Sequence, residues 1–231
     1  MFTNVKKIIS ILLALALIFA ACALGGCSGS ETTDPVYDSE GKLLEPDQYG
    51  KVKLGEYKGL SVTETIVTSS EKALEISMDY EKDQHPELSE EELKAFCEKK
   101  LADEMAQLGK NDAVAELVNQ AIENSKFKLN ETAVQYHFNE RMEYYQDMAD
   151  VYNMSIEEFA ANIVKNPDNF EEEIRLFASQ TVKLVLLAEA IVETENLPYD
   201  ASLTGDDAKS EKIDIAKEFI YQNAIVDRVV I

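Results

Sequence analysis

The sequence predicts a mainly α-helical fold: an extended helical cradle with projecting helical arms and one short N-terminal strand. Glycine is scarce, because the chain has nine glycines and only Gly109 falls between Leu60 and Thr204. An all-β domain would need many more turn residues over that length. Apolar side chains also recur at steps of three and four residues along several segments, as in amphipathic helices. A helix of about 25 residues would span about 38 Å, so we expect some helices to project as arms.

The first 26 residues (1–26) are typical of a bacterial lipoprotein signal peptide. Lys6 and Lys7 lie in a segment without acidic residues, and an apolar run from Ile8 to Leu24 follows, broken only by Ser10. A basic start, an apolar middle and small residues at the exit define a secretory signal. The run is slightly short for a stable membrane span, and no basic flank follows it. The alternatives are an ordinary secretory signal with a chance cysteine and an uncleaved anchor.

The sequence LGGC, which ends at Cys27, resembles a lipobox, in which the cysteine receives a lipid on its sulfur and becomes the new N-terminus. We predict lipidation of Cys27, with Cys22 as a weaker candidate because a bulky residue lies three positions before it. Residues 27–48 are predicted to form a flexible tether and residues 49–231 the folded domain. Cys97 would then be the only free thiol, without a disulfide partner, and we expect it to be a small buried residue.

The chain is strongly acidic, with 22 basic against 44 acidic residues and a formal net charge of −22. Removal of the signal takes away Lys6 and Lys7, which leaves 20 basic residues against 44 acidic ones and a charge of −24. Such a surface disfavours binding to nucleic acid and to anionic lipid headgroups. It suits a soluble body that a lipid holds on the extracytoplasmic face of a bacterial membrane. The charge would favour basic or unfolded cationic partners, although solubility alone also explains it.

Local signals divide the first half of the domain into one strand and three helices. The alternation in GLSVTETIV places Leu60, Val62 and Ile66 in a short strand. The sequence SEEE that starts at Ser89 is a capping box, in which serine and glutamate satisfy each other's backbone amides. The helices are expected from Ser69 or Ser70 to Tyr80, from Ser89 to a C-terminal cap at Gly109, and from Asn111 or Asp112 to beyond Ile122.

Four further helices are expected in the second half. Val134, Phe138 and Tyr145 follow helical spacing along a long segment. A second capping box lies in MSIEEF, and the proline of an Asn-Pro pair suits the first position of a helix. The helices are predicted from about Glu131 to Tyr152, from Ser155, from Asn166 to about Asn196, and at the end of the chain around Ile213 to Val226.

No catalytic or metal-binding constellation is recognisable in the sequence. The two histidines, His85 and His137, lie far apart and match no zinc spacing. No phosphate-binding loop and no nucleophile elbow is present. The pattern S-x-x-K starts at Ser69 and again at Ser125, without the companion motifs of penicillin-interacting enzymes. Carboxylates at 168–173 suit the dipole of a helix start. We therefore expect no enzyme activity, no metal and no cofactor.

Several stretches resemble bacterial trigger factor. The segment LGEYKGLSV at 54–62 is similar to the segment that leads out of the ribosome-binding part of that family. The stretch 113–196 resembles the family's C-terminal chaperone domain: a helix, a short extended piece at 125–129, a long Tyr- and Met-rich helix, and the step MSIEEF. Residues 217–229 fit the family's closing helix. The resemblance covers most of 49–231.

Two departures from trigger factor limit what the resemblance implies. The Gly-Phe-Arg signature of the ribosome-docking loop is absent, so no ribosome binding is expected. The FKBP-type prolyl isomerase domain would fall between residues 60 and 113, where the chain is too short and too poor in glycine for such a barrel. The part that remains resembles the cradle of SurA- and PrsA-like extracytoplasmic chaperones.

The resemblance, taken with the lipobox at Cys27, implies a membrane-anchored, ATP-independent holdase that binds unfolded or partly folded exported proteins. Aromatic and Met side chains on helical arms would bind apolar segments weakly and at many points. The alternative is a non-chaperone binding or assembly lipoprotein that uses the same helical scaffold for one envelope partner. The residues predicted to bind clients, for all of which core packing competes, are Phe138, Tyr145, Met148, Tyr152, Phe159 and Phe177.

Overall fold

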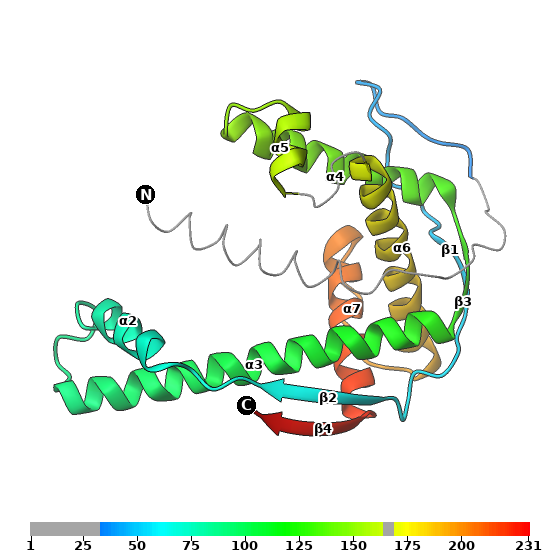
Figure 1. Ribbon diagram of the computed structural model, residues 1–231. Helices are drawn as coiled ribbons and strands as arrows, with labels where there is room; N and C mark the ends of the chain where they lie inside the picture. Colours follow the sequence, from blue (N-terminus) through cyan, green and yellow to red (C-terminus); the bar gives the residue numbers. More distant parts are fainter. Residues whose placement is uncertain (1–32, 164–168) are drawn as a thin grey trace. The chain divides into compact units, whose positions relative to one another are not determined.

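The fold is mainly α-helical, as the sequence predicts (Figure 1). A computed structural model describes residues 33–163 and 169–231, so the predicted signal peptide and Cys27 lie outside the described residues. The helices are α2 (Glu71–Glu81), α3 (Glu90–Asn124), α4 (Glu131–Val151), α5 (Ile156–Ile163), α6 (Phe170–Thr194) and α7 (Gly205–Gln222). The strands are β1 (Gly50–Lys53), β2 (Ser61–Ile66), β3 (Lys126–Leu129) and β4 (Ile225–Val230).

The described residues form two compact units. The first unit comprises Tyr57–Gln120 and Glu218–Ile231, and the second comprises Ala121–Lys217 with the part of Leu24–Glu56 from Thr33 onward. Each unit holds a two-stranded sheet, β2 with β4 in the first and β1 with β3 in the second. Within the described residues, no helix has both the length and the apolar character that crossing a membrane requires.

The last helix ends earlier than the sequence predicts, and a strand follows it. α7 stops at Gln222, and Val226 lies in β4 instead of a helix. The segment IVDRVV is rich in β-branched residues, which fit strands better than helices. This segment pairs in parallel with β2, from Ser61 opposite Ile225 to Ile66 opposite Val230. The pairing outweighs the weak helical spacing that predicted a helix here. The described residues therefore hold four strands, where the sequence predicted one.

α3 is one continuous helix where the sequence predicted two. It runs over Glu90–Asn124, so Gly109 lies inside the helix and does not cap it. The glycine is explained by crowding, because a Cβ on Gly109 would lie 2.5 Å from the carbonyl oxygen of Thr65 in β2. The predicted start of the helix is confirmed: the backbone N–H of Ser89 donates to the Glu92 carboxylate over 2.9 Å.

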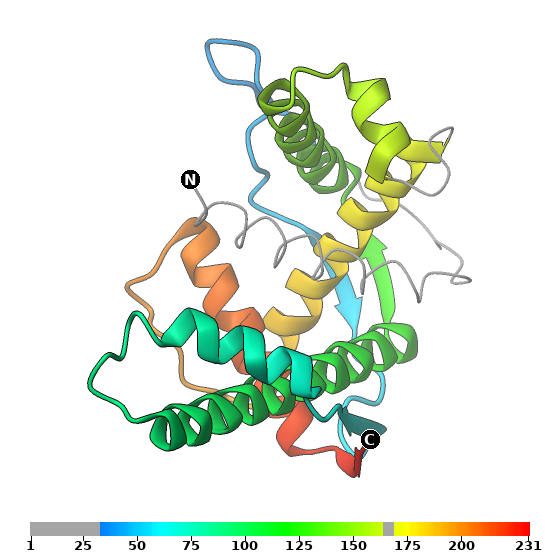
Figure 2. The same ribbon diagram turned by 60° about the vertical axis from the view of Figure 1, so that its left-hand side comes forward.

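α4 and α6 carry the core of the second unit. Ala133 and Val134 of α4 pack against a row of buried α6 residues, and partly buried Val52 of β1 and Phe127 of β3 pack on the same cluster. β1 and β3 pair antiparallel. Figure 1 and Figure 2 show α5 folded against one end of α4. The buried α6 residues of this cluster are Ala178, Val182, Val185 and Leu186.

α6 ends in a left-handed turn at an asparagine. The backbone N–H of Leu197 donates to the carbonyl of Val192 over 2.9 Å, and Asn196 has a φ of 51°. This is the Schellman arrangement, in which asparagine is the usual substitute for glycine. The helix is described from Phe170, and its predicted opening at 166–167 lies outside the described residues.

Residues 33–48 make specific contacts with the second unit. Asn130, the N-cap of α4, is buried and donates from Nδ2 to the carbonyl of Gln48 (2.6 Å) and to Oγ1 of Thr33 (3.0 Å). The hydroxyl of Thr132 donates to the carbonyl of Thr33 over 2.8 Å. The segment predicted as a tether over 27–48 is therefore held against α4 from Thr33 onward.

Candidate functional site

Backbone hydrogen bonds fix the end of α4. The N–H of Met154 donates to the carbonyl of Ala149 (2.9 Å), and the N–H of Asn153 donates to that of Asp150 (3.0 Å), which is the Schellman pattern. Asn153 takes the left-handed φ of 54° that this pattern requires. The chain therefore leaves α4 in one defined conformation, with Val151 just before the turn and Met154 just after it.

α5 begins with the predicted capping box. The N–H of Ser155 donates to the Glu158 carboxylate (2.9 Å), and the N–H of Glu158 donates to the Ser155 hydroxyl (3.2 Å). Hydrogen bonds from its own amide and from the Ser155 side chain hold the pKa of Glu157 below its usual range. Glu157 is therefore ionised at neutral pH and adds to the negative charge that Asp147 and Asp150 place at the end of α4.

Three apolar side chains of this turn are open to solvent. Val151 is 70% exposed, Tyr152 46% and Met154 38%. Single exposed apolar residues are common on soluble proteins, whereas three within four positions form a cluster. We call these three residues the α4–α5 turn. The ring of Tyr152 stacks on that of Phe159, with centroids 6.3 Å apart and planes 22° apart.

A buried aromatic cluster supports the α4–α5 turn from inside. Tyr145 of α4 lies with its ring centroid 6.2 Å from that of Phe159 in α5 and 5.4 Å from that of Phe170 in α6. All three rings are buried. Burial raises the pKa of Tyr145, so its hydroxyl stays neutral. The cluster therefore joins α4, α5 and α6 next to the exposed side chains of the α4–α5 turn.

Two arginines cover neighbouring aromatic faces. The guanidinium carbon of Arg141 lies 3.9 Å from the ring centroid of Phe177 and 5.8 Å from that of Tyr145. Arg175 lies 5.2 Å from the centroid of Phe138. Cations within about 6 Å of a ring face are attracted to it. The faces of Phe138 and Phe177 are therefore already occupied by cations.

Comparison with known proteins identifies a family. Residues 89–205, just over half of the chain, match the family described as bacterial trigger factor protein (TF) C-terminus. The chain belongs to the trigger factor C-terminal family. No curated protein and no solved structure matches the chain. The C-terminal domain of trigger factor is a chaperone module without catalytic activity of its own, and its match here runs from the capping box of α3 to the start of α7.

Five of the six predicted client-binding residues lie on α4, α5 and α6 of this trigger factor domain, and the sixth, Tyr152, lies directly after α4. Their surroundings differ. Two are buried, three are half-buried and one is exposed. The half-buried aromatics pack under arginine side chains, and the half-buried Met packs on the aromatic cluster. The exposed one alone is open to a client without movement of the fold. The buried residues are Tyr145 and Phe159, the half-buried ones are Phe138, Met148 and Phe177, and the exposed one is Tyr152.

Val151 and Met154 were not predicted as binding residues. The stripe read from the sequence ends with Tyr152, and Met154 marked only the approach to the next helix. The sequence does contain a signal for them, because Asn153 lies between two predicted helices and is typical of a helix end. Apolar residues beside it lie beyond the stripe that the helix buries, so they are candidates for exposure. Tyr152 and its neighbours therefore form the candidate site, and the binding role of all these residues stays a prediction.

His137 and Cys97 belong to the residue types most often used in metal sites and as nucleophiles. No set of three or more His, Cys, Asp or Glu side chains among the described residues could hold a metal ion. Nδ1 of His137 lies 2.9 Å from the Glu140 carboxylate, and its Nε2 lies 3.2 Å from the Tyr49 hydroxyl. Cys97 is a free thiol and fully buried, as the sequence predicts. The contacts of His137 and the burial of Cys97 are those of groups packed within the fold.

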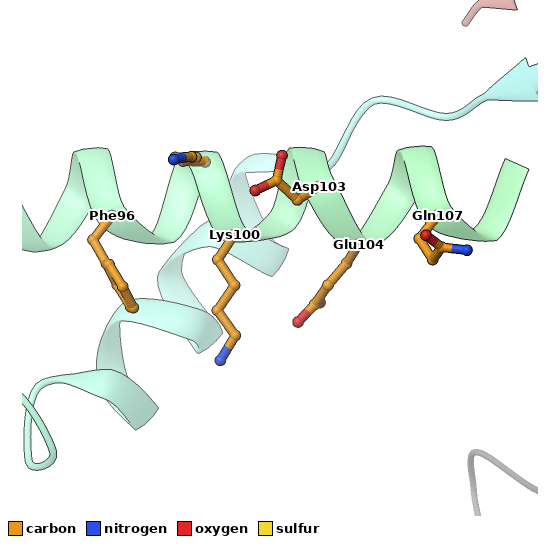
Figure 3. A pocket seen from close by; sticks show the side chains of 6 residues that line it. Phe96, Lys100, Asp103, Glu104 and Gln107 are labelled. Atoms are coloured by element: carbon orange, nitrogen blue, oxygen red, sulfur yellow. The ribbon is translucent and has the colours of Figure 1, made fainter. Parts of the chain in front are cut away.

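The depression shown in Figure 3 lies along one face of α3 in the first unit. The side chains that line it all come from that one helix, and Lys100 is paired with the buried carboxylate of Glu81 at 2.5 Å. A surface with a single wall does not enclose a small ligand. Its lining residues are Phe96, Lys99, Lys100, Asp103, Glu104 and Gln107.

Proposed function

We propose that this protein is a lipid-anchored, ATP-independent chaperone that binds unfolded or partly folded exported proteins on the extracytoplasmic face of a bacterial membrane. The observation that carries the proposal is the exposed apolar α4–α5 turn in a domain of a chaperone family. The lipid anchor rests on the sequence around Cys27.

The α4–α5 turn suits weak and reversible binding. Full burial of one Val or Met side chain contributes about 1.5–3 kcal/mol, and these side chains are already partly covered. Met154 adapts to varied apolar shapes because its side chain is flexible and polarisable. The acidic residues Asp147, Asp150 and Glu157 attract client segments in which basic residues flank apolar ones. Several such contacts on one client would add up to usable affinity while each stays fast to release.

A triple variant tests this site. Val151→Ser, Tyr152→Ser and Met154→Ser together should weaken the suppression of client aggregation several-fold at a fixed chaperone-to-client ratio. The matched control removes two aliphatic residues and one tyrosine that are equally exposed elsewhere in the same unit, and it should retain most of the activity. Equal loss in both variants, or no loss in either, would contradict a binding role of the α4–α5 turn. The control changes Val36, Tyr37 and Leu44 to Ser.

The same assay decides between the two functional classes. A chaperone should protect several unrelated aggregating clients at near-stoichiometric ratios. A dedicated binding or assembly lipoprotein should protect none of them and should instead bind one envelope protein. No isomerase activity is expected of this chain, so the purified protein should leave the cis–trans rate of a proline test peptide unchanged.

The anchor has its own test. Cys27→Ala should move the protein from the membrane fraction to the soluble or secreted fraction and abolish incorporation of a labelled fatty acid. Cys22→Ala is the matched control, because it removes the weaker candidate cysteine from the same signal. Retention of the label in Cys27→Ala and its loss in Cys22→Ala would move the lipidation site to Cys22.

A further inference from the structure

The β2–β4 sheet of the first unit exposes the backbone of β4 on one side. The N–H of Ile225 donates to the carbonyl of Leu60 (2.7 Å), and the N–H of Ile231 donates to that of Ile66 (3.0 Å). In a parallel pair only alternate residues bond to a given neighbour. The backbone N–H and C=O groups of the odd-numbered residues of β4 therefore point toward β2. Those of Val226, Arg228 and Val230 point to the opposite edge of the strand.

The other edge of the same sheet is covered by α3. The carbonyl of Ser61 accepts a hydrogen bond from Nε2 of Gln120 (3.1 Å). The carbonyl oxygen of Thr65 lies so close to α3 that a Cβ on Gly109 would be 2.5 Å from it. Figure 1 shows β2 running between α3 and β4. Within residues 33–163 and 169–231, the sheet therefore has one covered edge, on β2, and one open edge, on β4.

No described residue protects the open edge of β4. Among residues 33–163 and 169–231, none donates to or accepts from the outward backbone groups of β4. The side chains are also bare, since Ile225 is 65% exposed, Val230 64% and Ile231 65%. Natural edge strands are usually blunted by proline, bulges or several charges. β4 has no proline and only Asp227 and Arg228 as charged residues.

We propose that the open edge of β4 binds an extended segment of a client polypeptide, which adds to the sheet as a third strand. The proposal rests on the proposed chaperone function for the nature of its partner. Unpaired N–H and C=O groups in an extended row are matched only by another extended backbone. The edge of β4 recognises an extended backbone through hydrogen bonds, whereas the α4–α5 turn binds apolar side chains. It would therefore hold a client segment that lacks stable secondary structure.

A second copy of the chain fits this edge poorly. A symmetric dimer would pair two β4 strands antiparallel, and outward residues must then oppose outward residues. Opposing Val226 to Val230 places Arg228 directly opposite its own copy. Shifting the register so that Val226 opposes Arg228 places Asp227 opposite its own copy. Both of these registers set like charges against each other, which destabilises the pairing. The register that opposes Arg228 to Val230 avoids this but leaves the outward backbone groups of Val226 without a partner. A different polypeptide can pair with all three outward residues and is therefore the better partner.

The side chains of β4 also define the chemistry of that partner. Because side chains alternate between faces, Ile225, Asp227 and Val229 share the face that is turned away from buried Val62. A bound strand would place its own side chains beside them on the same face. Aliphatic residues opposite Ile225 and Val229, with a lysine or arginine opposite Asp227, would give favourable pairs. The preferred segment is therefore β-branched and basic.

Hydrogen exchange on the wild-type protein tests the proposal directly. The probe is the acetylated and amidated peptide TVTKTVT, added to saturation. We expect the amides of Val226, Arg228 and Val230 to exchange at least about tenfold more slowly with the peptide bound. Unchanged exchange of these three amides would overturn the proposal. Slow exchange that depends on protein concentration and needs no peptide would overturn it in favour of self-association.

Two matched comparisons make the test specific to backbone pairing. Val230→Pro removes one outward N–H at an exposed edge position that tolerates proline, and it should weaken peptide affinity about tenfold. Val230→Ala keeps that N–H and should bind nearly as well as the wild type. N-methylation of one alternate set of peptide amides should abolish binding, and methylation of the other set should not. Equal effects of the two substitutions, or of the two methylated peptides, would contradict strand addition.

This experiment stands apart from the test of the chaperone function. It uses a short soluble peptide and reports on β4 amides alone, whereas the aggregation assay compares variants of the α4–α5 turn. A protein that suppresses aggregation but leaves the β4 amides unprotected keeps the proposed function and loses strand addition. Protection by the peptide without aggregation suppression would leave β4 as a peptide site and overturn the holdase role.

Discussion

The carbonyl oxygen of Thr65 occupies the space that a side chain on Gly109 would need, because a Cβ there would lie 2.5 Å away. Alanine is better than glycine in a helix by about 1 kcal/mol, yet α3 carries this glycine in its middle. The close passage of β2 explains the choice. α3 thereby covers the β2 edge of the β2–β4 sheet, and among the described residues the edge of β4 is the open one.

Gly109→Ala should therefore destabilise the protein, although helix propensity alone predicts the opposite. The new methyl group forces β2 or α3 to shift, at an expected cost of about 1–3 kcal/mol in the free energy of unfolding. Chemical denaturation measures this cost. Ala102→Gly, at an exposed position of the same helix, is the control and should cost about 1 kcal/mol from propensity alone. A Gly109→Ala variant more stable than the wild type would contradict the close contact.

Tyr221→Phe should destabilise the first unit through a buried carboxylate. Glu64 is only 4% exposed, and its carboxylate accepts hydrogen bonds from the Tyr221 hydroxyl and from Nε of Arg228, the latter over 3.2 Å. Loss of the hydroxyl removes one donor to a buried charged group, which should cost about 1–3 kcal/mol. In a Glu64→Gln background the same change should cost less, because the amide is neutral. Equal costs in both backgrounds, measured by denaturation, would show that the two residues are not coupled.

Stability should fall as the pH rises through about 10, the ordinary pKa of tyrosine. Burial, followed by the hydrogen bond to Glu45, raises the pKa of Tyr49, and burial raises that of Tyr145. Above pH 10 the unfolded chain loses these protons while the folded chain keeps them, so the unfolded state binds fewer protons and is favoured. Absorbance titration at alkaline pH should show these two rings ionising only with unfolding. Native ionisation of all ten tyrosines at the ordinary pKa would contradict it, and Tyr49→Phe should reduce the pH dependence.

Features that depend on residues close together in the sequence were predictable from it. The caps at Ser70, Ser89 and Ser155 are confirmed, because a cap is an exchange of hydrogen bonds within one helical turn. The interior position of Gly109 and the strand β4 were not predicted. Both depend on β2, which is distant in sequence from each of them. The spacing of nearby residues carries no information about such distant partners. It therefore predicts a helix end at Gly109 and a helix at Val226, where the structure has a helix interior and a strand.

The sequence predicts the helices around the candidate site and one of its residues, Tyr152, but not Val151 or Met154. The aromatic stripe of α4 is real, since Phe138 and Tyr145 both face core clusters. Which members of the stripe remain open depends on where α5 and α6 pack. Tyr152 lies one residue beyond the end of α4 and is exposed, whereas Tyr145, two turns earlier, is buried under two other rings.

Tyr152→Ala and Phe159→Ala should separate client binding from stability, although the two rings stack on each other. Phe159 is buried, so its truncation should cost about 3–5 kcal/mol in the free energy of unfolding. Tyr152 is 46% exposed, so its truncation should cost less than about 1 kcal/mol. It should nevertheless weaken binding to a permanently unfolded client by roughly fivefold, which corresponds to about 1 kcal/mol. Denaturation curves and client affinity at a temperature where both variants are folded provide the two measurements. If Phe159→Ala weakens binding more than Tyr152→Ala while it remains folded, clients enter the aromatic cluster itself, and the exposed surface of the α4–α5 turn is not the site.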